Sequence, residues 1–363
     1  MSRRDVAIVS FAQSPSSPEV AETEAQMLFP VIDEAVARSG VPRRDIGFTC
    51  SGSADYLAGA SFAFVGNLEA VGAWPPISES HVEMDGAWAL YEAWVRLQHG
   101  DIDTALVFSS GISSRGALRE VLCLQNDPYY LMPLWVDHVS LAALQARSLL
   151  DAGKATEDDL AEVAARSRRD GFRNPFAQVG EDFRRSGRRR EPDCTAADMA
   201  AEPVVVAPLR TGDCPPVSDA AAAMVLVAGE RARDVCERPA WIRGIDHRVE
   251  PHYPGVRDLT RSESTRLAGE HAGAGEAPVD VAELSATFSH EELILRDALG
   301  LGDEVVVNPS GGALAAHPLM VTGLVRIGEA FRQIHDHGRS RTLGHATSGP
   351  CLQQNLVCVL EGS

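Results

Sequence analysis

The residues whose chemistry and positions best suit catalysis surround one histidine in the C-terminal part of the chain. His317 and Pro318 follow the run Asn308-Pro-Ser-Gly-Gly-Ala-Leu-Ala-Ala, which contains Gly311 and Gly312. Glycines let a ligand approach the backbone, and a helix starting near Pro318 would direct its first N–H groups at developing negative charge. A histidine beside the N-terminus of such a helix is a candidate acid–base residue. The alternative is a helix-capping histidine that only packs.

A second concentration of charge is the group of arginines between about residues 166 and 190, in an otherwise acidic chain. It includes Arg188, Arg189 and Arg190. Such guanidinium groups can clamp the phosphates of a large anionic ligand. The alternatives are a solvated basic loop and a docking patch for an acidic partner.

Strands and helices alternate on both sides of this arginine-rich region. Before it, the patterns predict strands at 6–12, 46–50, 81–84 and 104–109 and helices at 21–39 and 86–98. After it, they predict strands at 241–245, 279–285, 304–308 and 341–347 and a helix at 291–299. The chain is therefore expected to be α/β.

One sequence of elements occurs twice along the chain. A strand, a small-residue loop, a helix and a second strand end at Ser110-Gly111 and again at Ser348-Gly349. Such duplication predicts two equivalent halves with helices sandwiched between two sheets. We expect an N-terminal half at 1–111, completed by about 208–235, an inserted loop domain at 112–207, and a C-terminal half at 236–363.

Composition excludes several classes of function. The 363 residues include 33 Lys and Arg against 51 Asp and Glu, a net charge of -18 that repels nucleic acid and anionic membranes. The seven cysteines are scattered without a CxxC pair, which disfavours disulfides and a zinc site. No apolar run approaches the roughly 20 residues of a membrane helix. We expect a cytoplasmic protein with no bound metal.

Three motifs resemble the thiolase family in the same order. The run ending at His317 is similar to its Asn-Pro-x-Gly-Gly and Gly-His-Pro motif, with Ala316 replacing glycine. Asn174-Pro-Phe-Ala resembles the end of its insertion helix, and Ser218-Asp-Ala-Ala-Ala resembles its Ser-Asp-Gly-Ala-Ala strand. The likeness spans the chain and is greatest to the lipid-transfer-protein, or sterol-carrier-protein thiolase-like, branch. It implies the thiolase fold, with duplicated βαβαβ halves in a five-layered α/β sandwich.

A departure from that family bears directly on the chemistry. Thiolases carry their acyl-accepting cysteine in a Cys-x-Ser-Gly run, where this chain reads Glu83-Met-Asp-Gly86. Gly86 sets the register, so Glu83 takes the nucleophile's position. A carboxylate is a much poorer nucleophile than a thiolate. Thiolytic cleavage is therefore disfavoured, and the structural alternative for Glu83 is a buried ion pair.

Two further family motifs are altered. The Asn-Glu-Ala-Phe run that helps to bind the thioester oxygen is replaced by Ser285-Ala-Thr-Phe. Ser285 or His290 could still donate to that oxygen, although His290 is equally well explained as a surface residue. The family's acid–base cysteine near the C-terminus is matched by Cys351, which is either catalytic or a buried structural thiol.

These motifs together predict a carbon–carbon lyase, an aldolase acting on acyl-CoA. A base would take the β-hydroxyl proton, and the enolate of the thioester would be reprotonated. The roles fall to His317 as base, Glu83 as its orienter or an alternate base, Ser285 and His290 as oxyanion donors, and Cys351 as proton donor. Coenzyme A would belong to the substrate, with Gly311, Gly312, Arg188, Arg189 and Arg190 binding it, and no cofactor would be bound covalently.

Two other functions stay open. The chain could be a non-catalytic thiolase-like subunit that pairs with an active homologous chain, or an acyl-CoA thiolase or acetyltransferase. The resemblance to actinobacterial steroid side-chain aldolases implies steroid or cholesterol catabolism. It also implies a thiolase-type homodimer or heterodimer and a small OB-fold, zinc-ribbon partner that binds acyl-CoA.

Overall fold

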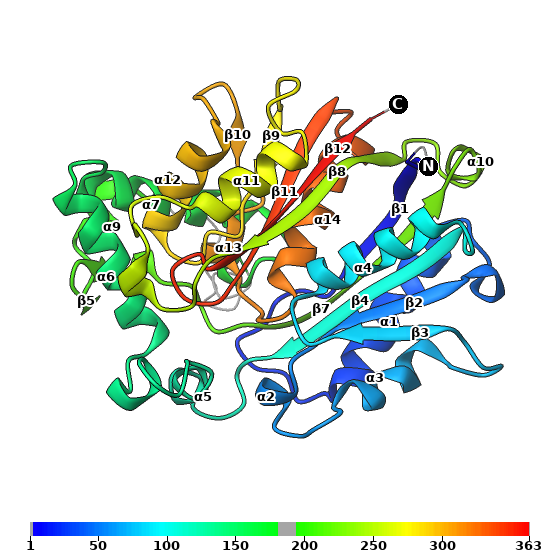
Figure 1. Ribbon diagram of the computed structural model, residues 1–363, viewed down its shortest axis with the longest axis horizontal. Helices are drawn as coiled ribbons and strands as arrows, with labels where there is room; N and C mark the ends of the chain where they lie inside the picture. The colour runs from blue at the N-terminus through cyan, green and yellow to red at the C-terminus, as the bar shows by residue number, and fades with distance from the viewer. Residues whose placement is uncertain (1–2, 181–193, 363) are drawn as a thin grey trace.

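The computed structural model describes residues 3–180 and 194–362. Within them lies a sheet of ten strands in the order β10-β9-β11-β12-β8-β1-β7-β4-β2-β3 (Figure 1). Arg188, Arg189 and Arg190 fall outside the described residues. No helix in the described ranges is long and apolar enough to cross a membrane.

The first five-stranded part of the sheet comes from the N-terminal half and one later strand. Its strands are β1 (Val6–Gln13), β2 (Phe48–Gly52), β3 (Glu79–Val82), β4 (Thr104–Ile112) and β7 (Asp219–Ala228). Strand β7 lies between β1 and β4, so the chain returns to this half after the insertion. Both faces of β7 are buried, which agrees with the continuous apolar run that follows Asp219 in its sequence.

The second part of the sheet repeats this arrangement. Its strands are β8 (Ala240–Val249), β9 (Val281–Glu283), β10 (Val306–Val307), β11 (Arg341–Ser348) and β12 (Gln354–Glu361). Reading each part from its outer edge, β3-β2-β4-β7-β1 corresponds to β10-β9-β11-β12-β8. The same order in both parts confirms the predicted duplication. The parts meet where β1 pairs with β8, Ala7 opposite Trp241 and Ile8 opposite Ala240.

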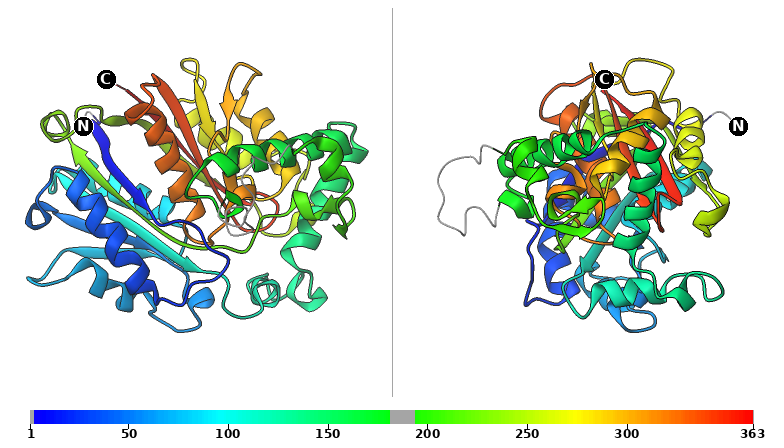
Figure 2. Two further views of the ribbon diagram at one scale, coloured as in Figure 1. Left: turned by 180° about the vertical axis from the view of Figure 1, so that it is seen from behind. Right: turned by 90° about the vertical axis from the view of Figure 1, so that its left-hand side faces the viewer.

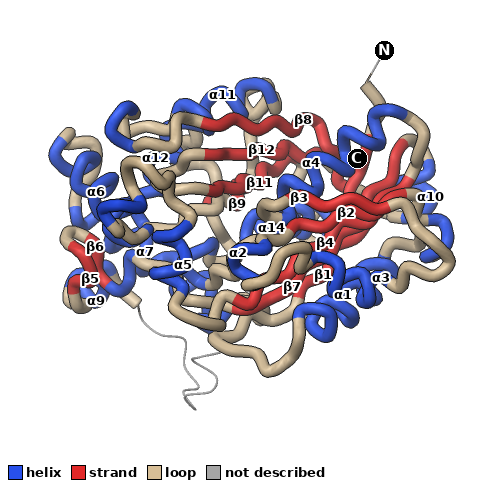
Figure 3. The backbone as a smooth tube through the Cα atoms, turned by 60° about the horizontal axis from the view of Figure 1, so that its bottom comes forward, coloured by secondary structure: helices blue, strands red, loops and turns tan. Residues whose placement is uncertain are grey.

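Two equivalent helices, α4 (Gly86–His99) and α14 (Thr322–His335), fill the space between the two parts of the sheet (Figure 3). They share one apolar core with strands of both halves, including Leu90, Leu324 and Ile8. Alternate residues of β1, such as Ala7 and Val9, point the other way into a separate core. Strand β1 therefore separates two apolar layers.

Outer helices complete the sandwich. Helices α1 (Glu24–Arg38) and α3 (Phe64–Val71) cover the first part, and α11 (Glu263–His271) and α12 (Ser289–Leu299) cover the second. The layers run helix, sheet, helix, sheet, helix, as expected for a five-layered α/β sandwich. The short helices α2 (Asp55–Ala58), α10 (Arg231–Val235) and α13 (Gly312–Ala315) join these layers.

The inserted segment forms helices at one end of the sandwich, drawn in green in Figures 1 and 2. They are α5 (Leu118–Leu124), α6 (His138–Asp151), α7 (Glu157–Arg173) and α9 (Ala196–Ala200), with a small sheet of β5 (Val204–Val206) and β6 (Leu209–Arg210). Helix α6 packs against the start of α12. Ala142 of α6 and Phe288, the residue before α12, share one apolar cluster with Leu160 of α7. This contact places the insertion beside the ends of β9 and β11.

Candidate active site

A cavity of about 390 Å³ lies where the loops after β3, β9, β10 and β11 meet the inserted helices. Parallel strands such as β9, β10 and β11 end at the same edge of a sheet, and ligands commonly bind at that edge. Among the described residues, the titratable side chains lining it are Asp85, His138, His252, Glu291, His317 and Cys351. The lining therefore combines acid–base groups with apolar residues and carries no lysine or arginine within residues 3–180 and 194–362.

His317 lies on the cavity wall just before α14, as the sequence predicts for an acid–base residue. Its backbone N–H donates to Ser218 Oγ at 3.0 Å, which ties it to the entry of β7. The Thr322 hydroxyl donates its proton to the Pro318 carbonyl at 2.9 Å. Its oxygen, 3.0 Å from His317 Nδ1, must then accept the Nδ1 proton.

This hydrogen-bond pattern assigns the histidine tautomer. With the proton on Nδ1, the lone pair of His317 Nε2 is available as a base. Burial, with smaller contributions from His138 and Arg326, lowers the pKa of His317 to about 3. The imidazole is therefore neutral at pH 7 and can accept a proton.

Cys351 also lines the cavity, but its thiol is not activated. Its Sγ donates to the Leu141 carbonyl at 3.3 Å, and burial raises the pKa of the thiol to about 12. Reactive cysteines have the opposite property, a depressed pKa. Cys351 is thus a protonated thiol at neutral pH.

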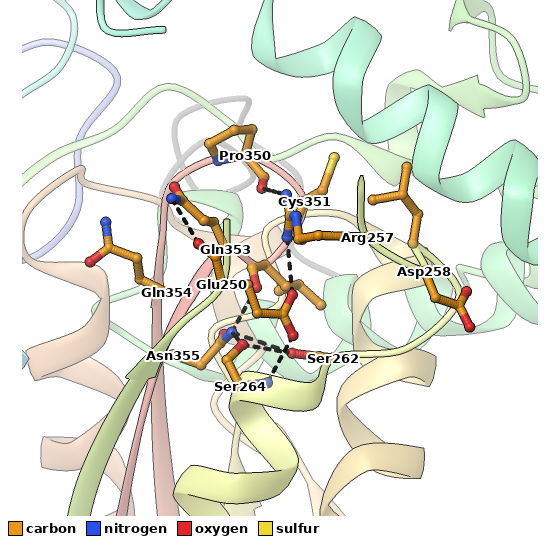
Figure 4. A network of polar contacts seen from close by, with 12 residues as sticks. Glu250, Arg257, Asp258, Ser262, Ser264, Pro350, Cys351, Gln353, Gln354 and Asn355 are labelled. Atoms are coloured by element: carbon orange, nitrogen blue, oxygen red, sulfur yellow. Dashed lines mark hydrogen bonds and ion pairs between the residues drawn. The ribbon is translucent and has the colours of Figure 1, made fainter. Parts of the chain in front are cut away.

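The loop that carries Cys351 is fixed by a buried network (Figure 4). Arg257 donates to the Pro350 and Cys351 carbonyls, both at 2.9 Å, and pairs with Glu250 at 3.3 Å. Asn355 Nδ2 donates to the Leu352 carbonyl at 2.8 Å. Cys351 and Leu352 have φ angles of 55° and 57°, an unfavourable region for residues with a Cβ. The network holds this strained loop against the cavity.

The register places Glu83 and Asp85 differently from the sequence expectation. Glu83 is exposed, its Oε1 accepts the Asp55 N–H at 2.5 Å, and it does not line the cavity. Asp85 is 4% exposed and lines the cavity. Its carboxylate accepts the N–H groups of Ala87, Gly323 and Leu324 at 2.8 to 3.0 Å, so its oxygens are already bonded.

Ser285 and His290 are buried but do not reach the cavity. The Ser285 N–H donates to His345 Nδ1 at 3.3 Å. His290 Nε2 lies 3.2 Å from Gln145 Oε1 and donates to it, while burial lowers the pKa of His290 to about 3. Ser285 thus links the loop after β9 to β11, and His290 links α12 to α6. His290 is therefore a core residue and not a surface one.

Gly311 and Gly312 likewise lie away from the cavity. Their φ angles are 96° and 64°, which favour glycine. A Cβ on Gly311 would lie 2.5 Å from the Gly171 Cα. The turn therefore allows α7 to approach the backbone after β10. Within the described ranges, no group of three or more His, Cys, Asp or Glu side chains is arranged to hold a metal ion.

Besides Asp85, sequence reasoning missed three titratable groups of the cavity. His138 begins α6, its Nδ1 is buried without a hydrogen-bond partner among the described residues, and burial lowers its pKa. His252 donates from Nδ1 to Gln353 and accepts the Asp127 N–H at 3.1 Å. Glu291 stands in the first turn of α12. An acidic residue there is ordinarily a helix cap, so its sequence context gave no functional signal.

Comparisons with known proteins give one consistent family. No family model matches the sequence. Benzoylsuccinyl-CoA thiolase subunit BbsB of Thauera aromatica is 24% identical over 59% of this chain and 60% of its own length. Acetyl-CoA acetyltransferase of Methanothermobacter thermautotrophicus is 25% identical over 76% of both chains. Sterol carrier protein 2 of Gallus gallus is 24% identical over 89% of this chain and 64% of its own. The chain thus spans less than two thirds of BbsB and of sterol carrier protein 2.

Two solved structures share the fold over nearly their whole length. The Ltp2-ChsH2(DUF35) aldolase has a TM-score of 0.81 with 20% identity, covering 98% of this chain and 97% of that one. The Bacillus anthracis acetyl-CoA acetyltransferase has a TM-score of 0.77 with 18% identity, covering 99% of both chains. The chain therefore has the thiolase fold, and its sequence is similar to those of thiolases and of sterol carrier protein 2.

Proposed function

We propose that this protein is an acyl-CoA lyase that cleaves a β-hydroxyacyl-CoA by a retro-aldol reaction, without a covalent intermediate. One observation carries the proposal. The cavity holds a neutral histidine with a free Nε2, while the cysteine that lines it, Cys351, donates to a carbonyl and has a pKa of about 12. The site thus has a base but no thiolate in its described lining.

The reaction begins with proton transfer to His317 Nε2. As the β-hydroxyl loses its proton, the Cα–Cβ bond breaks and its electron pair forms the thioester enolate. A ketone or aldehyde leaves, and Cα is then protonated. Glu83, Ser285 and His290 do not line the cavity, so the proposal gives them no direct role. The side-chain amides of Gln125 and Gln354 line it and offer neutral donors for the thioester oxygen.

The substrate, the partner, the assembly and the compartment form the more specific part of the proposal. A structure named as an aldolase in complex with ChsH2(DUF35) has the TM-score of 0.81. We further propose a steroid side-chain CoA thioester as the substrate, and a small OB-fold, zinc-ribbon chain that binds acyl-CoA as a partner. A thiolase-type dimer, homomeric or heteromeric, is the proposed assembly, and the cytoplasm is the proposed compartment.

The names of the relatives favour two alternatives. BbsB is a thiolase subunit and two relatives are acetyl-CoA acetyltransferases. A thiolase would need Cys351 as its nucleophile, because Glu83 stands at the position of the thiolase cysteine. A non-catalytic subunit would keep the fold but would need an active homologous chain.

The deciding experiment is incubation of the purified complex with a panel of β-hydroxyacyl-CoA thioesters in the absence of free CoA. A lyase forms a ketone or aldehyde and a shortened acyl-CoA, and intact-mass analysis finds no acyl group on the chain. An acyl adduct on Cys351 and dependence on free CoA would establish a thiolase instead. Cleavage by the partner chain alone would establish the non-catalytic subunit.

A further inference from the structure

Three glutamates near the start of α12 are buried, and two of them have cationic partners. Glu283, on β9, accepts from Arg326 at 2.8 Å and from the Ser310 hydroxyl at 2.7 Å. Glu292 pairs with Arg166 at 2.5 Å and accepts from Asn308 Nδ2 at 3.0 Å. Neither lines the cavity. Both carboxylates therefore have a structural role as partners of buried or half-buried arginines.

Glu291 differs from both. It is 4% exposed, lines the cavity, and within residues 3–180 and 194–362 forms no ion pair with a lysine, arginine or histidine. Its Oε2 accepts the N–H groups of Thr287 and Phe288 at 2.8 and 3.1 Å. In the described part of the chain its Oε1 accepts no hydrogen bond. This oxygen atom is also not among the fully buried side-chain atoms that lack a partner, so it is accessible. One oxygen therefore holds the side chain in place, and the other is left for the cavity.

A buried carboxyl group without a counter-ion costs stability when it is ionised, so its presence on a cavity wall points to function. Burial raises the pKa of Glu291 to about 7, partly offset by the amides of Phe288 and Thr287. The other titratable groups that face this cavity in the described residues are Asp85, His138, His252, His317 and Cys351. At neutral pH Glu291 therefore exists in both its acid and its carboxylate form.

We propose that Glu291 is the acid that protonates the enolate carbon of the cleaved thioester. This inference rests on the proposed lyase function. His317 Nε2 takes the β-hydroxyl proton, the Cα–Cβ electron pair becomes the enolate, and the Glu291 carboxylic acid delivers its proton to Cα. The imidazolium and carboxylate that result are neutralised when the proton moves from His317 to Glu291 through solvent after product release. Protons and electrons balance without another reactant.

Cys351 is the competing proton donor on the same wall. Its thiol has a pKa of about 12 and already donates to the Leu141 carbonyl. Glu291, with a pKa of about 7, is the stronger acid by about 10⁵. Protonation of the enolate is therefore assigned to the carboxyl group and not to the thiol.

A half-reaction tests this role independently of the aldol substrate. Propionyl-CoA in D₂O exchanges its Cα protons if the Glu291 carboxylate can remove one and return a deuteron. The purified complex is incubated with this probe, and mass spectrometry measures deuterium in the acyl group. Glu291→Gln keeps the shape and an acceptor oxygen, and we expect it to slow exchange by about a hundredfold, the usual scale for a positioned acid–base group. Glu292→Gln is the matched control, since it changes the adjacent buried carboxylate outside the cavity.

The pH dependence provides the second readout. Exchange started by the carboxylate should rise with pH through about 7, whereas cleavage that needs the acid should fall over the same range. Both dependences should disappear in Glu291→Gln. Equal exchange in wild type and Glu291→Gln overturns the inference, as does loss of exchange in Cys351→Ser with retention in Glu291→Gln. Absence of exchange in the wild type also overturns it. Exchange that depends on Glu291 without any cleavage supports the inference and rejects the lyase function.

Discussion

At the scale of single residues, the carboxylates near the thiolase nucleophile position have separate tasks. Asp85 accepts one N–H from the start of α4 and two from the start of α14. Glu83, two residues earlier, is exposed and binds only the Asp55 N–H among the described residues. Buried amides must be paired, so the inner carboxylate has a structural task that the outer one lacks.

Replacement of Asp85 should therefore destabilise the fold. Asp85→Ala removes the cap of α4 and leaves two N–H groups of α14 without a partner, and we expect a loss of about 2–4 kcal/mol in the free energy of unfolding. Chemical denaturation measures it. Glu83→Ala is the control and should change stability by less than about 1 kcal/mol. Equal losses for the two variants would contradict this assignment.

His317 should matter for turnover and not for folding. His317→Ala removes the free Nε2 and should lower turnover about a hundredfold or more, while the unfolding midpoint stays close to that of the wild type. Thr322→Val removes the acceptor of the Nδ1 proton and should lower turnover to a smaller extent. Product formation from a β-hydroxyacyl-CoA measures both. A fully active His317→Ala variant would refute the mechanism.

Glu291 should also reduce stability at high pH. Its pKa is about 7 in the folded protein against 4.5 for an ordinary glutamate, so the folded state binds more protons between these pH values. The stability contributed by this group is present below pH 4.5 and is lost as the pH rises through 7. Glu291→Gln should be up to about 3 kcal/mol more stable than wild type at pH 8 and similar to it at pH 4. Denaturation at the two pH values measures this, and a variant less stable at pH 8 would contradict it.

At the scale of elements, the loop between β11 and β12 shows how the fold positions Cys351. Two consecutive residues adopt positive φ, and the only support visible in the sequence is a lone glycine at position 349. The structure supplies Arg257, 5% exposed in its side chain, to hold two carbonyls of the loop. The loop conformation thus depends on a residue about 90 positions away in the chain.

Removal of Arg257 should release this loop. Arg257→Met leaves the Glu250 carboxylate and two carbonyls without their partner, and we expect a loss of about 3–5 kcal/mol, the scale for breaking a buried ion pair. Arg261→Met is the control from the same segment, because Arg261 is 63% exposed and its ion pair with Asp258 should contribute less than about 1 kcal/mol. Urea unfolding compares the two. Similar losses would show that the network does not hold the loop.

Much of the secondary structure followed from local patterns, and the differences have local causes. The helix predicted at 86–98 is observed as Gly86–His99, because its apolar spacing and the Asp85 cap are both local signals. The helix expected near Pro318 begins only at Thr322, since Met320 adopts a φ of 69° that interrupts it. The strand predicted at 279–285 is limited to Val281–Glu283 because β10 and β11 pair with only these residues.

The candidate site was harder to predict than the elements. His317 and Cys351 carry recognisable sequence contexts and do line one cavity. Glu291 became visible only when the partners of the three buried glutamates were known, since a sequence does not reveal which acids lack a cation. The match of Glu83 to the thiolase cysteine did not indicate which way its side chain points. In the structure Glu83 points away from the cavity, and Asp85 lines it instead.

At the scale of the whole molecule, the β3 edge of the sheet is open to solvent along the unpaired side of that strand. Strand β3 pairs only with β2 in the described residues, and its surroundings expose Trp74 to 88% and Phe62 to 70%. Open strand edges beside exposed apolar residues are ready templates for pairing with a second chain. This edge therefore fits the expected thiolase-type dimer.

Light scattering at micromolar concentration should give the mass of a dimer. Trp74→Ser should weaken the dimer at least tenfold, because a large exposed aromatic side chain is a typical interface anchor. Tyr129→Ser, which changes an aromatic residue 82% exposed in the inserted segment, is the control and should leave the mass unchanged. A wild-type monomer would rule out this assembly, and a dimer insensitive to Trp74→Ser would place its interface elsewhere.

The Asp85 cap also limits which residues the fold tolerates at positions 83 and 85. The carboxylate joins the equivalent helices of two duplicated halves, α4 through one amide and α14 through two. A cysteine at position 83 would stand on the outside, and a cysteine at position 85 would leave those amides unpaired. Neither substitution therefore gives a buried nucleophile while keeping those amides paired. For the proposed lyase, a return to thiolase chemistry through this loop would therefore require changes at several positions in both halves.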